Sequence, residues 1–473
     1  MVKKLDDIQA RINDEGYTES LSHQELLAKL ELEKVLDMEE AFWHEKSRIK
    51  WHSEGDRNTT FFHKSAKIKQ AYKKISSIRV DDVVLTEPAQ IASHVVNHFQ
   101  NLFTGSNNVH DNGLIEDVIP RLVNDNVNNL LTLLPSIVEI KNAVFAMNKN
   151  GAPGPDGFGA FFYQTYWDII KEDVCNAVLE FFTFNWILPN FNSNTVVLIP
   201  KVSDADTIGQ FRPIAMANFK FKIISKILAD RLALVLPDLI SNEQRGFVQG
   251  RQIKDCILLT SEAINMLHQK SYGGNLAIKI DIAKAFDTID WSFLIKVLKV
   301  FGFNSIFCNW ISTILHSARL SISINGKNEG YFECARGVRQ GDPLSPLLFC
   351  LAEEVLSRGL TKLVNDGHLK LIKGTRSNHI PSHILYADDV MLFCKGTSAN
   401  INVLTDFFAK YAQISGQYVN PLKSTIFAGS MSQSRVNNIA HSLGFSIGSL
   451  PFIYLGVPIF KGSNCSKVLS KAC

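Results

Sequence analysis

Three aspartate residues beside apolar strands are the side chains of this sequence best suited to chemistry on phosphate groups. Asp281 follows an apolar run, and Asp388 and Asp389 lie between two further apolar runs. Turn chemistry alone also explains adjacent aspartates, and a strand ending in aspartate is common. Here, however, the strands would hold the carboxylates at the edge of a core, where a bound dication would relieve their repulsion. Mg²⁺ prefers a few carboxylates with water and substrate phosphates, and two such ions promote phosphoryl transfer.

The elements that must position these aspartates follow from the apolar pattern. The two runs around Asp388 and Asp389 predict a β-hairpin with the aspartates at its tip. Such pairing, combined with separate helices, predicts an α+β fold with antiparallel character rather than a doubly wound sheet. Apolar and β-branched runs predict strands over residues 195–199, 276–281, 320–325, 384–386 and 390–393, and helical periodicity predicts helices over 219–234 and 346–360.

The first 135 residues have a different pattern. A long helix is expected from about Ser22, a hairpin over residues 75–85, and a further helix after Pro88. Residues 105–129 are polar and rich in asparagine and aspartate, which is typical of a linker. The main domain boundary is therefore expected near residue 136.

The composition is that of a globular protein. The 473 residues are 46% hydrophobic and 20% charged, with a net charge of +3, which argues against global disorder. The eight cysteines are scattered and lack zinc-site spacing, and no apolar leader follows Met1, so we expect reduced thiols in a soluble intracellular protein. No apolar run approaches the length of a membrane span, and no membrane partner is expected.

One segment, residues 46–74, is strongly basic. It carries nine lysine and arginine residues against two acidic ones, a net charge of +7, with Trp51, Phe61, Phe62 and Tyr72 interleaved. Such a segment suits a polyanion, and its aromatic rings suit unpaired bases; a solvated helical face is the alternative. The cations expected to contact nucleic acid are Lys46, Arg48, Lys50, Arg57, Lys64 and Lys67.

Eight ordered blocks together resemble the reverse transcriptases of non-long-terminal-repeat, LINE-like retrotransposons of the kind abundant in plants. A single block would be a weak signal, whereas eight in order over residues 136–460 are specific. Residues 46–63 also resemble the linker that precedes the polymerase in plant members. The blocks are 151–157 (Gly-Ala-Pro-Gly-Pro-Asp-Gly), 198–201 (Leu-Ile-Pro-Lys) with 211–214 (Phe-Arg-Pro-Ile), 244–247 (Gln-Arg-Gly-Phe), 280–287 (Ile-Asp-Ile-Ala-Lys-Ala-Phe-Asp), 337–349 (beginning Gly-Val-Arg-Gln-Gly-Asp), 386–389 (Tyr-Ala-Asp-Asp), 420–424 (Asn-Pro-Leu-Lys-Ser) and 454–457 (Tyr-Leu-Gly-Val).

The resemblance implies a right-hand polymerase with fingers and an antiparallel palm sheet over residues 136–460, preceded by a mainly helical, basic linker region with a small hairpin over 1–135. Asp281, Asp388 and Asp389 match the metal-binding catalytic triad of that family. The implied cofactor is Mg²⁺, two ions, with Mn²⁺ as a possible substitute.

The resemblance also assigns residues to the incoming nucleotide. Lys201 and Arg212 match the cations that hold the triphosphate, a role suited to an ammonium and a guanidinium; exposed strand-end cations are the alternative. Phe286 matches a bulky gate that excludes a ribose 2′-hydroxyl, with core packing as the alternative. Gln340 and Gly341 match a turn where backbone approaches nucleotide and template, and Tyr386 belongs to the block of the paired aspartates.

Two further sites follow from the same resemblance. Lys423 matches a lysine proposed to protonate the leaving pyrophosphate, a general-acid role; a surface lysine is the alternative. Leu455 and Gly456 match the turn that grips the primer end. Asp287 and Asp290 are expected to be local caps rather than metal ligands.

Three functional hypotheses remain. The leading one is an RNA-directed DNA polymerase that copies an RNA template from a DNA or RNA primer with deoxynucleoside triphosphates, in the nucleus or cytoplasm, with the nucleus as the expected site of action. The second is a catalytically inactive remnant that binds nucleic acid. The third, a maturase-like protein, is disfavoured by the upstream block. Family members carry an endonuclease upstream and a helical thumb downstream; we expect neither here beyond a truncated thumb start at 461–473.

Overall fold

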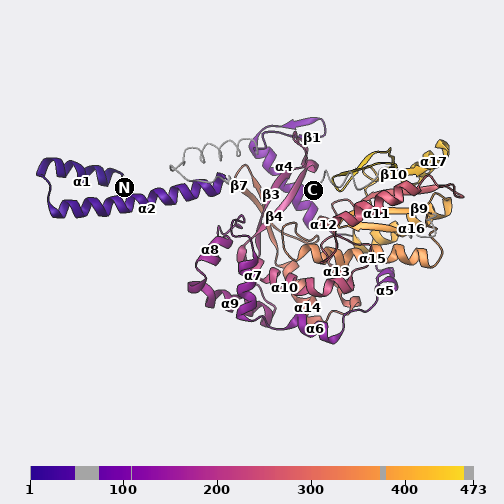
Figure 1. The fold of residues 1–473 in the computed structure, drawn as a ribbon, viewed down its shortest axis with the longest axis horizontal. Helices are drawn as coiled ribbons and strands as arrows, with labels where there is room; N and C mark the ends of the chain where they lie inside the picture. The colour runs from indigo at the N-terminus through magenta and orange to yellow at the C-terminus, as the bar shows by residue number, and fades with distance from the viewer. Residues whose placement is uncertain (1, 48–73, 108, 373–379, 463–473) are drawn as a thin grey trace. The chain divides into compact units, whose positions relative to one another are not determined.

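The computed structural model describes residues 2–47, 74–107, 109–372 and 380–462 (Figure 1). The chain divides into two compact units, residues 1–77 and 78–473. This division falls well before the boundary expected near residue 136. Among the described helices, none combines the length and apolar character needed to cross a membrane.

The first unit contains a helical hairpin. Helix α1 (Val2–Glu15) and helix α2 (Glu19–Ser47) pack through Ile8, Leu21 and Ala28, which are buried. Helix α2 begins three residues before the expected Ser22. The mainly helical character expected for this region is therefore correct, whereas residues 48–73, with most of the basic segment, lie outside the described residues.

Residues 78–135 belong to the second unit because their apolar side chains are buried in it. Strands β1 (Ile78–Val80) and β2 (Val83–Leu85) form the expected hairpin, and helix α4 (Pro88–Thr104) packs on strands β6 and β7. The linker expected over residues 105–129 was wrong. That segment contains helix α5 (Leu114–Val118) and the start of helix α6 (Asp125–Thr132), and Ile115, Ile119 and Val123 are all part of the core.

A four-stranded sheet has the order β4-β3-β6-β7. Strand β3 pairs antiparallel with β4 and parallel with β6, and β6 pairs antiparallel with β7. The expected strands at 195–199 and 320–325 are confirmed as β3 and β6. The bounds are β3 (Ser193–Pro200), β4 (Phe211–Ala217), β6 (Arg319–Ile324) and β7 (Lys327–Glu333).

A five-stranded sheet of order β11-β10-β5-β9-β8 carries the three aspartates. Its pairings are antiparallel except for the edge pair β10 and β11, which is parallel. This confirms the α+β class and the antiparallel hairpin. The bounds are β5 (Asn275–Asp281), β8 (His383–Tyr386), β9 (Asp389–Lys395), β10 (Thr425–Gly429) and β11 (Ser446–Ile447).

Both faces of this sheet are covered, which explains the unbroken apolar runs of its central strands. Alternate residues of β9 enter two cores: Val390 and Leu392 pack into the large core, whereas Met391 and Phe393 pack into a second cluster. The large core contains helices α13 (Trp291–Phe301), α15 (Ser345–Asn365) and α16 (Ser398–Ser415), and the second contains α11 (Ile253–Met266) (Figure 1).

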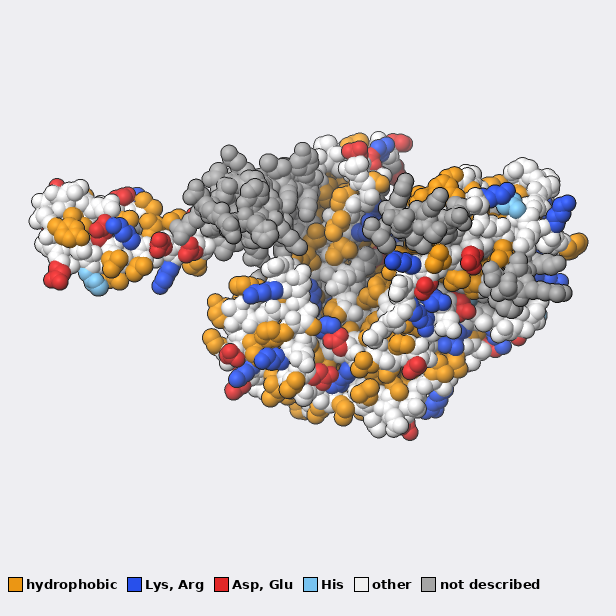
Figure 2. All heavy atoms as spheres, viewed as in Figure 1, with side chains coloured by type: hydrophobic (Ala, Val, Ile, Leu, Met, Phe, Trp, Pro, Cys, Tyr) orange, Lys and Arg blue, Asp and Glu red, His pale blue; other side chains and the backbone are white. Residues whose placement is uncertain are grey.

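The remaining elements complete the second unit. On the face seen in Figure 2, acidic and basic side chains are interspersed among apolar ones, in keeping with the small net charge. The helices are α7 (Ile137–Ala146), α8 (Ala160–Thr165), α9 (Trp167–Phe184), α10 (Phe219–Leu239), α12 (Ala285–Thr288), α14 (Ser305–His316), α17 (Gln433–Leu443) and the 3₁₀ helix Ile208–Gln210, and a last hairpin pairs β12 (Phe452–Tyr454) with β13 (Val457–Ile459).

Candidate active site

Asp281, Asp388 and Asp389 come together at one end of the five-stranded sheet. Asp281 is the last residue of β5, and its partner in the β5–β9 register is Asp389, the first residue of β9. Directly opposed residues of antiparallel strands have their Cβ atoms about 4.5–5.5 Å apart. Asp388 lies in the two-residue turn between β8 and β9 and is exposed. The fold thus gathers the three predicted carboxylates around one strand pair.

A buried glutamine, Gln244, holds the turn that carries Asp388. Its Oε1 accepts hydrogen bonds from the backbone N–H groups of Ala387 (3.0 Å) and Gly246 (2.8 Å). Ala387 has φ +55°, a conformation that few non-glycine residues adopt without support. The sequence blocks included Gln244 but gave it no role, because its partner Ala387 is 143 residues away.

Desolvation and neighbouring negative charge together shift the pKa values of Asp388 and Asp389. Desolvation by the surrounding protein raises the pKa of Asp388, and the negative charges of Asp389 and Asp281 raise it further. Desolvation and the charge of Asp281 likewise raise the pKa of Asp389, against the opposing effect of Lys279. A dication would relieve this excess of negative charge, and carboxylate oxygens are the donors that Mg²⁺ prefers.

The three aspartates suit a metal ion by the type of their donor atoms and do not form a complete coordination shell. In the described part of the chain, no group of three or more histidine, cysteine, aspartate or glutamate side chains is already in position to hold an ion. An open set of this kind suits Mg²⁺, which keeps several water or substrate-phosphate ligands.

Two cations approach the carboxylates from the other sheet. Arg212 on β4 pairs with Ile199 on β3, and Lys201 follows β3 directly, with its Nζ donating to the Gly209 carbonyl at 2.9 Å. Desolvation and the neighbouring charges of Lys423 and Arg212 lower the pKa of Lys201. Lys201 also interacts electrostatically with Asp281, and Arg212 with Asp388. The predicted triphosphate cations therefore do lie within electrostatic reach of the aspartates.

Lys423 reaches the same region because its loop is fastened to the end of β5. The Asn420 N–H donates to the Asp281 carbonyl at 2.7 Å, and the Asp281 N–H donates to Ser424 Oγ at 3.1 Å. Lys423 lies between these two anchors, is exposed, and interacts electrostatically with Lys201.

Phe286 lies five residues beyond Asp281 and stacks on Phe349 of α15, with ring centroids 4.1 Å apart. The ring is half-buried, so one face belongs to the core. The stack on Phe349 agrees with core packing, and the gate stays a prediction. Tyr386 is also half-buried and is the register partner of Asp389 on the neighbouring strand β8.

Gln340 and Gly341 lie against strand β4. The Ala215 N–H donates to the Gln340 carbonyl at 2.8 Å. Gly341 has φ +108°, and a Cβ there would lie 2.6 Å from the Ala215 carbonyl oxygen. The close backbone approach expected at this glycine is thus made to β4, the strand that carries Arg212.

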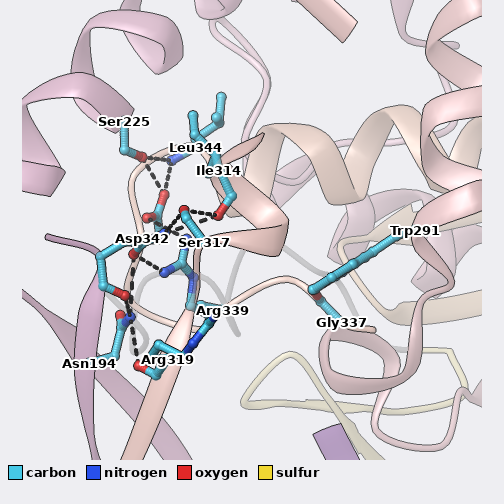
Figure 3. Close-up of polar contacts among 11 residues, drawn as sticks. Asn194, Ser225, Trp291, Ile314, Ser317, Arg319, Gly337, Arg339, Asp342 and Leu344 are labelled. Atoms are coloured by element: carbon cyan, nitrogen blue, oxygen red, sulfur yellow. Dashed lines mark hydrogen bonds and ion pairs between the residues drawn. The ribbon is translucent and has the colours of Figure 1, made fainter. Parts of the chain in front are cut away.

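A buried polar cluster anchors the segment that contains Gln340 (Figure 3). The Arg339 guanidinium donates to Asn192 and lies 3.8 Å from Asp342. Asp342 accepts from Ser225 on α10 and from the Leu344 N–H. At the other end, Trp291 Nε1 donates to the Gly337 carbonyl at 2.8 Å. Sequence reasoning missed these anchors, because Asn192, Ser225 and Trp291 are distant in the chain from the segment that they hold.

Leu455 and Gly456 form the turn of the β12–β13 hairpin. Both have positive φ, +48° and +80°, as a two-residue hairpin turn of type I′ requires. Leucine at such an angle is unusual and needs support from its surroundings. Lys279 on β5 contacts the same hairpin, since its Nζ lies 3.4 Å from the Ile453 carbonyl oxygen. The hairpin therefore packs beside the sheet that carries the aspartates.

The two aspartates expected to be caps behave differently. Asp290 caps α13 by accepting from the Ser292 and Phe293 N–H groups, as expected. The expectation for Asp287 was wrong: its carboxylate is buried and accepts from Gln340 Nε2 at 3.3 Å.

The predicted nucleic-acid contacts of the basic segment fall on side chains that the structure does not describe. Lys46 belongs to the last turns of α2, in the other unit, and its side chain lies outside the described residues, as do Arg48, Lys50, Arg57, Lys64 and Lys67.

The sequence of this chain also matches a known protein family. Residues 199–459 match the family described as reverse transcriptase (RNA-dependent DNA polymerase). The chain is 29% identical over 356 residues, 73% of its length, to the transposon TX1 uncharacterized 149 kDa protein of Xenopus laevis. It is 27% identical over 277 residues, 58% of its length, to the Pol polyprotein of the type-2 retrotransposable element R2DM of Drosophila melanogaster. It spans about a quarter of each relative, 26% and 24%.

A shorter relative is matched over most of its own length. An uncharacterized mitochondrial protein of Arabidopsis thaliana is 35% identical over 109 residues, which cover 88% of that protein and 23% of this chain.

Proposed function

Because the chain belongs to the reverse transcriptase (RNA-dependent DNA polymerase) family, we propose that it is an RNA-directed DNA polymerase of a non-long-terminal-repeat retrotransposon. It would copy an RNA template by extending a DNA or RNA primer with deoxynucleoside triphosphates. The observation that carries this proposal is the register of β5 and β9, which sets Asp281 opposite Asp389 with Asp388 in the adjoining turn.

Asp281, Asp388 and Asp389 would hold two Mg²⁺ ions, with Mn²⁺ as a possible substitute. Bound there, the ions would supply activation of the primer 3′-hydroxyl and stabilisation of charge on the phosphates. Desolvation raises the pKa of Asp388 and Asp389 most, and the charge of Asp281 raises both further; a dication would relieve that repulsion, which supports this assignment.

The other residues of the site would bind and orient the substrates. Lys201 and Arg212 would hold the triphosphate, and Lys423 would donate a proton to the leaving pyrophosphate. Desolvation lowers the pKa of Lys201, and the nearby charges of Lys423 and Arg212 lower it further; a bound polyanion would offset the repulsion among these cations. Phe286 would exclude a 2′-hydroxyl, Tyr386, Gln340 and Gly341 would border the nucleotide, and Leu455 with Gly456 would contact the primer end.

The two sheets correspond to two parts of a right-hand polymerase. The sheet β4-β3-β6-β7 would belong to the fingers and the sheet β11-β10-β5-β9-β8 to the palm, within residues 136–460. We propose action in the nucleus, with the basic segment 46–74 contacting the RNA.

Primer extension with the purified chain tests the proposal. A 5′-labelled DNA primer annealed to an RNA template is incubated with deoxynucleotides and Mg²⁺, and the products are separated by length. Extension should require Mg²⁺ and be restored by Mn²⁺ after chelation. Binding to the primer–template without any extension in either metal would favour the alternative, a nucleic-acid-binding remnant.

A further inference from the structure

Asp287 is a buried carboxylate that the proposed mechanism leaves without a role. Its side chain is 5% exposed, in the short helix α12, six residues beyond Asp281. Gln340 Nε2 donates to Asp287 Oδ1 at 3.3 Å. A buried carboxylate that carries such a hydrogen bond beside the active site has either a structural or a positioning purpose.

The backbone around this contact is held on both sides. The Val338 N–H donates to the Phe286 carbonyl at 2.7 Å, and the Gly337 N–H donates to the Ile289 carbonyl at 2.8 Å. A Cβ on Gly337 would lie 2.6 Å from the Asp287 carbonyl oxygen. Segment 337–340 therefore runs directly against α12.

On its other side, Gln340 is hydrogen-bonded to β4, the strand that carries Arg212. Its carbonyl accepts from the Ala215 N–H on β4, three residues beyond Arg212. The main chain of Gln340 is thus set by β4 and its side chain by Asp287. The residue thus links β4 to α12, the short helix that follows β5, at the point where the incoming nucleotide is proposed to lie.

We infer that Asp287 is a positioning residue that fixes the orientation of the Gln340 carboxamide for binding of the incoming deoxynucleotide, an inference that rests on the proposed polymerase function. An ionised carboxylate only accepts hydrogen bonds, so it faces the amide –NH₂ and not the amide oxygen. This selects one of the two amide orientations and leaves Gln340 Oε1 and the second N–H for the substrate.

The charges around Asp287 suit this role. Burial raises the pKa of Asp287 to about 7 and the charge of Asp388 adds to this shift, while Lys284, the Gln340 hydrogen bond and Lys201 favour its ionised form, so the carboxylate is mostly ionised above about pH 7. Lys201 is one of the proposed triphosphate cations. Asp287 is therefore linked to nucleotide-binding groups on two sides rather than to solvent.

The variant that tests the inference is Asp287→Asn, which has the same shape but presents either a donor or an acceptor to Gln340. Loss of one fixed hydrogen bond should raise the KM for deoxynucleotide roughly 5- to 30-fold. The rate kcat should change less than about threefold, because the reacting groups are untouched. The Kd for the next deoxynucleotide on a dideoxy-terminated primer–template should rise by the same factor as KM.

A double-mutant cycle separates positioning from a general structural effect. In a Gln340→Ala background, Asp287→Asn should raise KM no further. Asp290→Ser is the matched control: it removes the nearby carboxylate that caps α13, keeps a capping oxygen, and should leave KM unchanged. If the asparagine variant is unstable, Asp287→Ser replaces it.

The outcomes distinguish this inference from the proposed function. An unchanged KM and Kd in Asp287→Asn, or factors that multiply in the double variant, would overturn the positioning role while the polymerase activity stands. Absence of metal-dependent extension by the parent chain would overturn both.

Discussion

Asp281 and Asp389 face each other across the β5–β9 ladder, and this pairing fixes where the proposed chemistry takes place. The flanking pairs are Ile280 with Val390 and Ile278 with Leu392, all buried. A slip of one residue would exchange Val390 and Leu392, which fill the large core, with Met391 and Phe393, which fill the second cluster, so the fit of these side chains in the two cores specifies the register. The carboxylates are held opposite each other by the packing of their neighbours.

The first prediction concerns this triad. Asp281→Asn or Asp388→Asn should reduce nucleotide incorporation at least about 10³-fold, roughly 4 kcal/mol of transition-state stabilisation, because each removes a metal-binding carboxylate. Primer extension under single-turnover conditions measures the loss. Asp238→Asn, on the exposed face of α10, is the control and should retain the parental rate. A near-parental rate in either triad variant would show the assignment to be wrong.

The second prediction concerns the gate. Phe286→Ala should raise the ratio of ribonucleotide to deoxynucleotide incorporation, because the ring would no longer fill the space that a 2′-hydroxyl needs. Its stack on Phe349 means that some stability is lost as well, so the ratio is compared at a temperature where both proteins are folded. Phe286→Tyr keeps the bulk and should keep the discrimination. Unchanged selectivity in the alanine variant, with turnover intact, would assign Phe286 to the core alone.

The third prediction concerns Glu353, a buried residue of α15. Tyr411 Oη lies 3.3 Å from Glu353 Oε1 and also donates to Gln417, whose Nε2 donates to the Ala285 carbonyl next to Phe286. Burial raises the pKa of Glu353 to about 8; Gln417 and Tyr411 act against this shift, whereas Asp388 and Glu354 add to it. The fold therefore holds this carboxyl group in its neutral form.

The raised pKa of Glu353 makes the stability of the folded protein depend on pH. Between the ordinary pKa of 4.5 and the folded value of about 8, the folded state keeps a proton that the unfolded state releases. The contribution of Glu353 to stability therefore decreases as pH rises through this window. Glu353→Gln, which is always neutral, should unfold at a higher temperature than the parent at pH 8 and differ little at pH 5. Glu262→Gln, exposed on α11, is the control. Equal shifts at both pH values would contradict the prediction.

The fourth prediction concerns the basic segment. Deleting residues 1–74 should weaken RNA binding and flatten its dependence on salt, while residues 78–473 stay folded, since they form their own compact unit. The logarithm of the binding constant should fall with the logarithm of the salt concentration, with a slope of about 0.7 per phosphate contacted on single strands. Fluorescence anisotropy at several salt concentrations measures the slope.

A variant of the full chain with four substitutions separates the effect of lost charge from the effect of the lost segment. Replacing Lys50, Arg57, Lys64 and Lys67 with glutamine removes cations and keeps the segment, and its slope should approach that of the deletion. Equal slopes for the parent and both variants would show that these cations do not contact nucleic acid.

The sequence alone determined the elements that carry the reactive groups. Strand β5, the β8–β9 hairpin and the helix at 346–360 are set by local apolar patterns, so these patterns suffice to assign Asp281, Asp388 and Asp389 to strand ends and the turn between strands. The cap at Asp290 is equally local, since its partners are two and three residues away.

Only the tertiary structure decided how those groups are supported. Gln244 clamps the Asp388 turn from 143 residues away, and Gln340 orients on Asp287 across 53 residues. Residues 105–129 look like a linker by composition, yet Ile115, Ile119 and Val123 are buried. The local sequence pattern indicates which residues favour a strand or a turn. Whether a polar group is buried, and which distant partner satisfies it, depends on packing between elements that no local window contains.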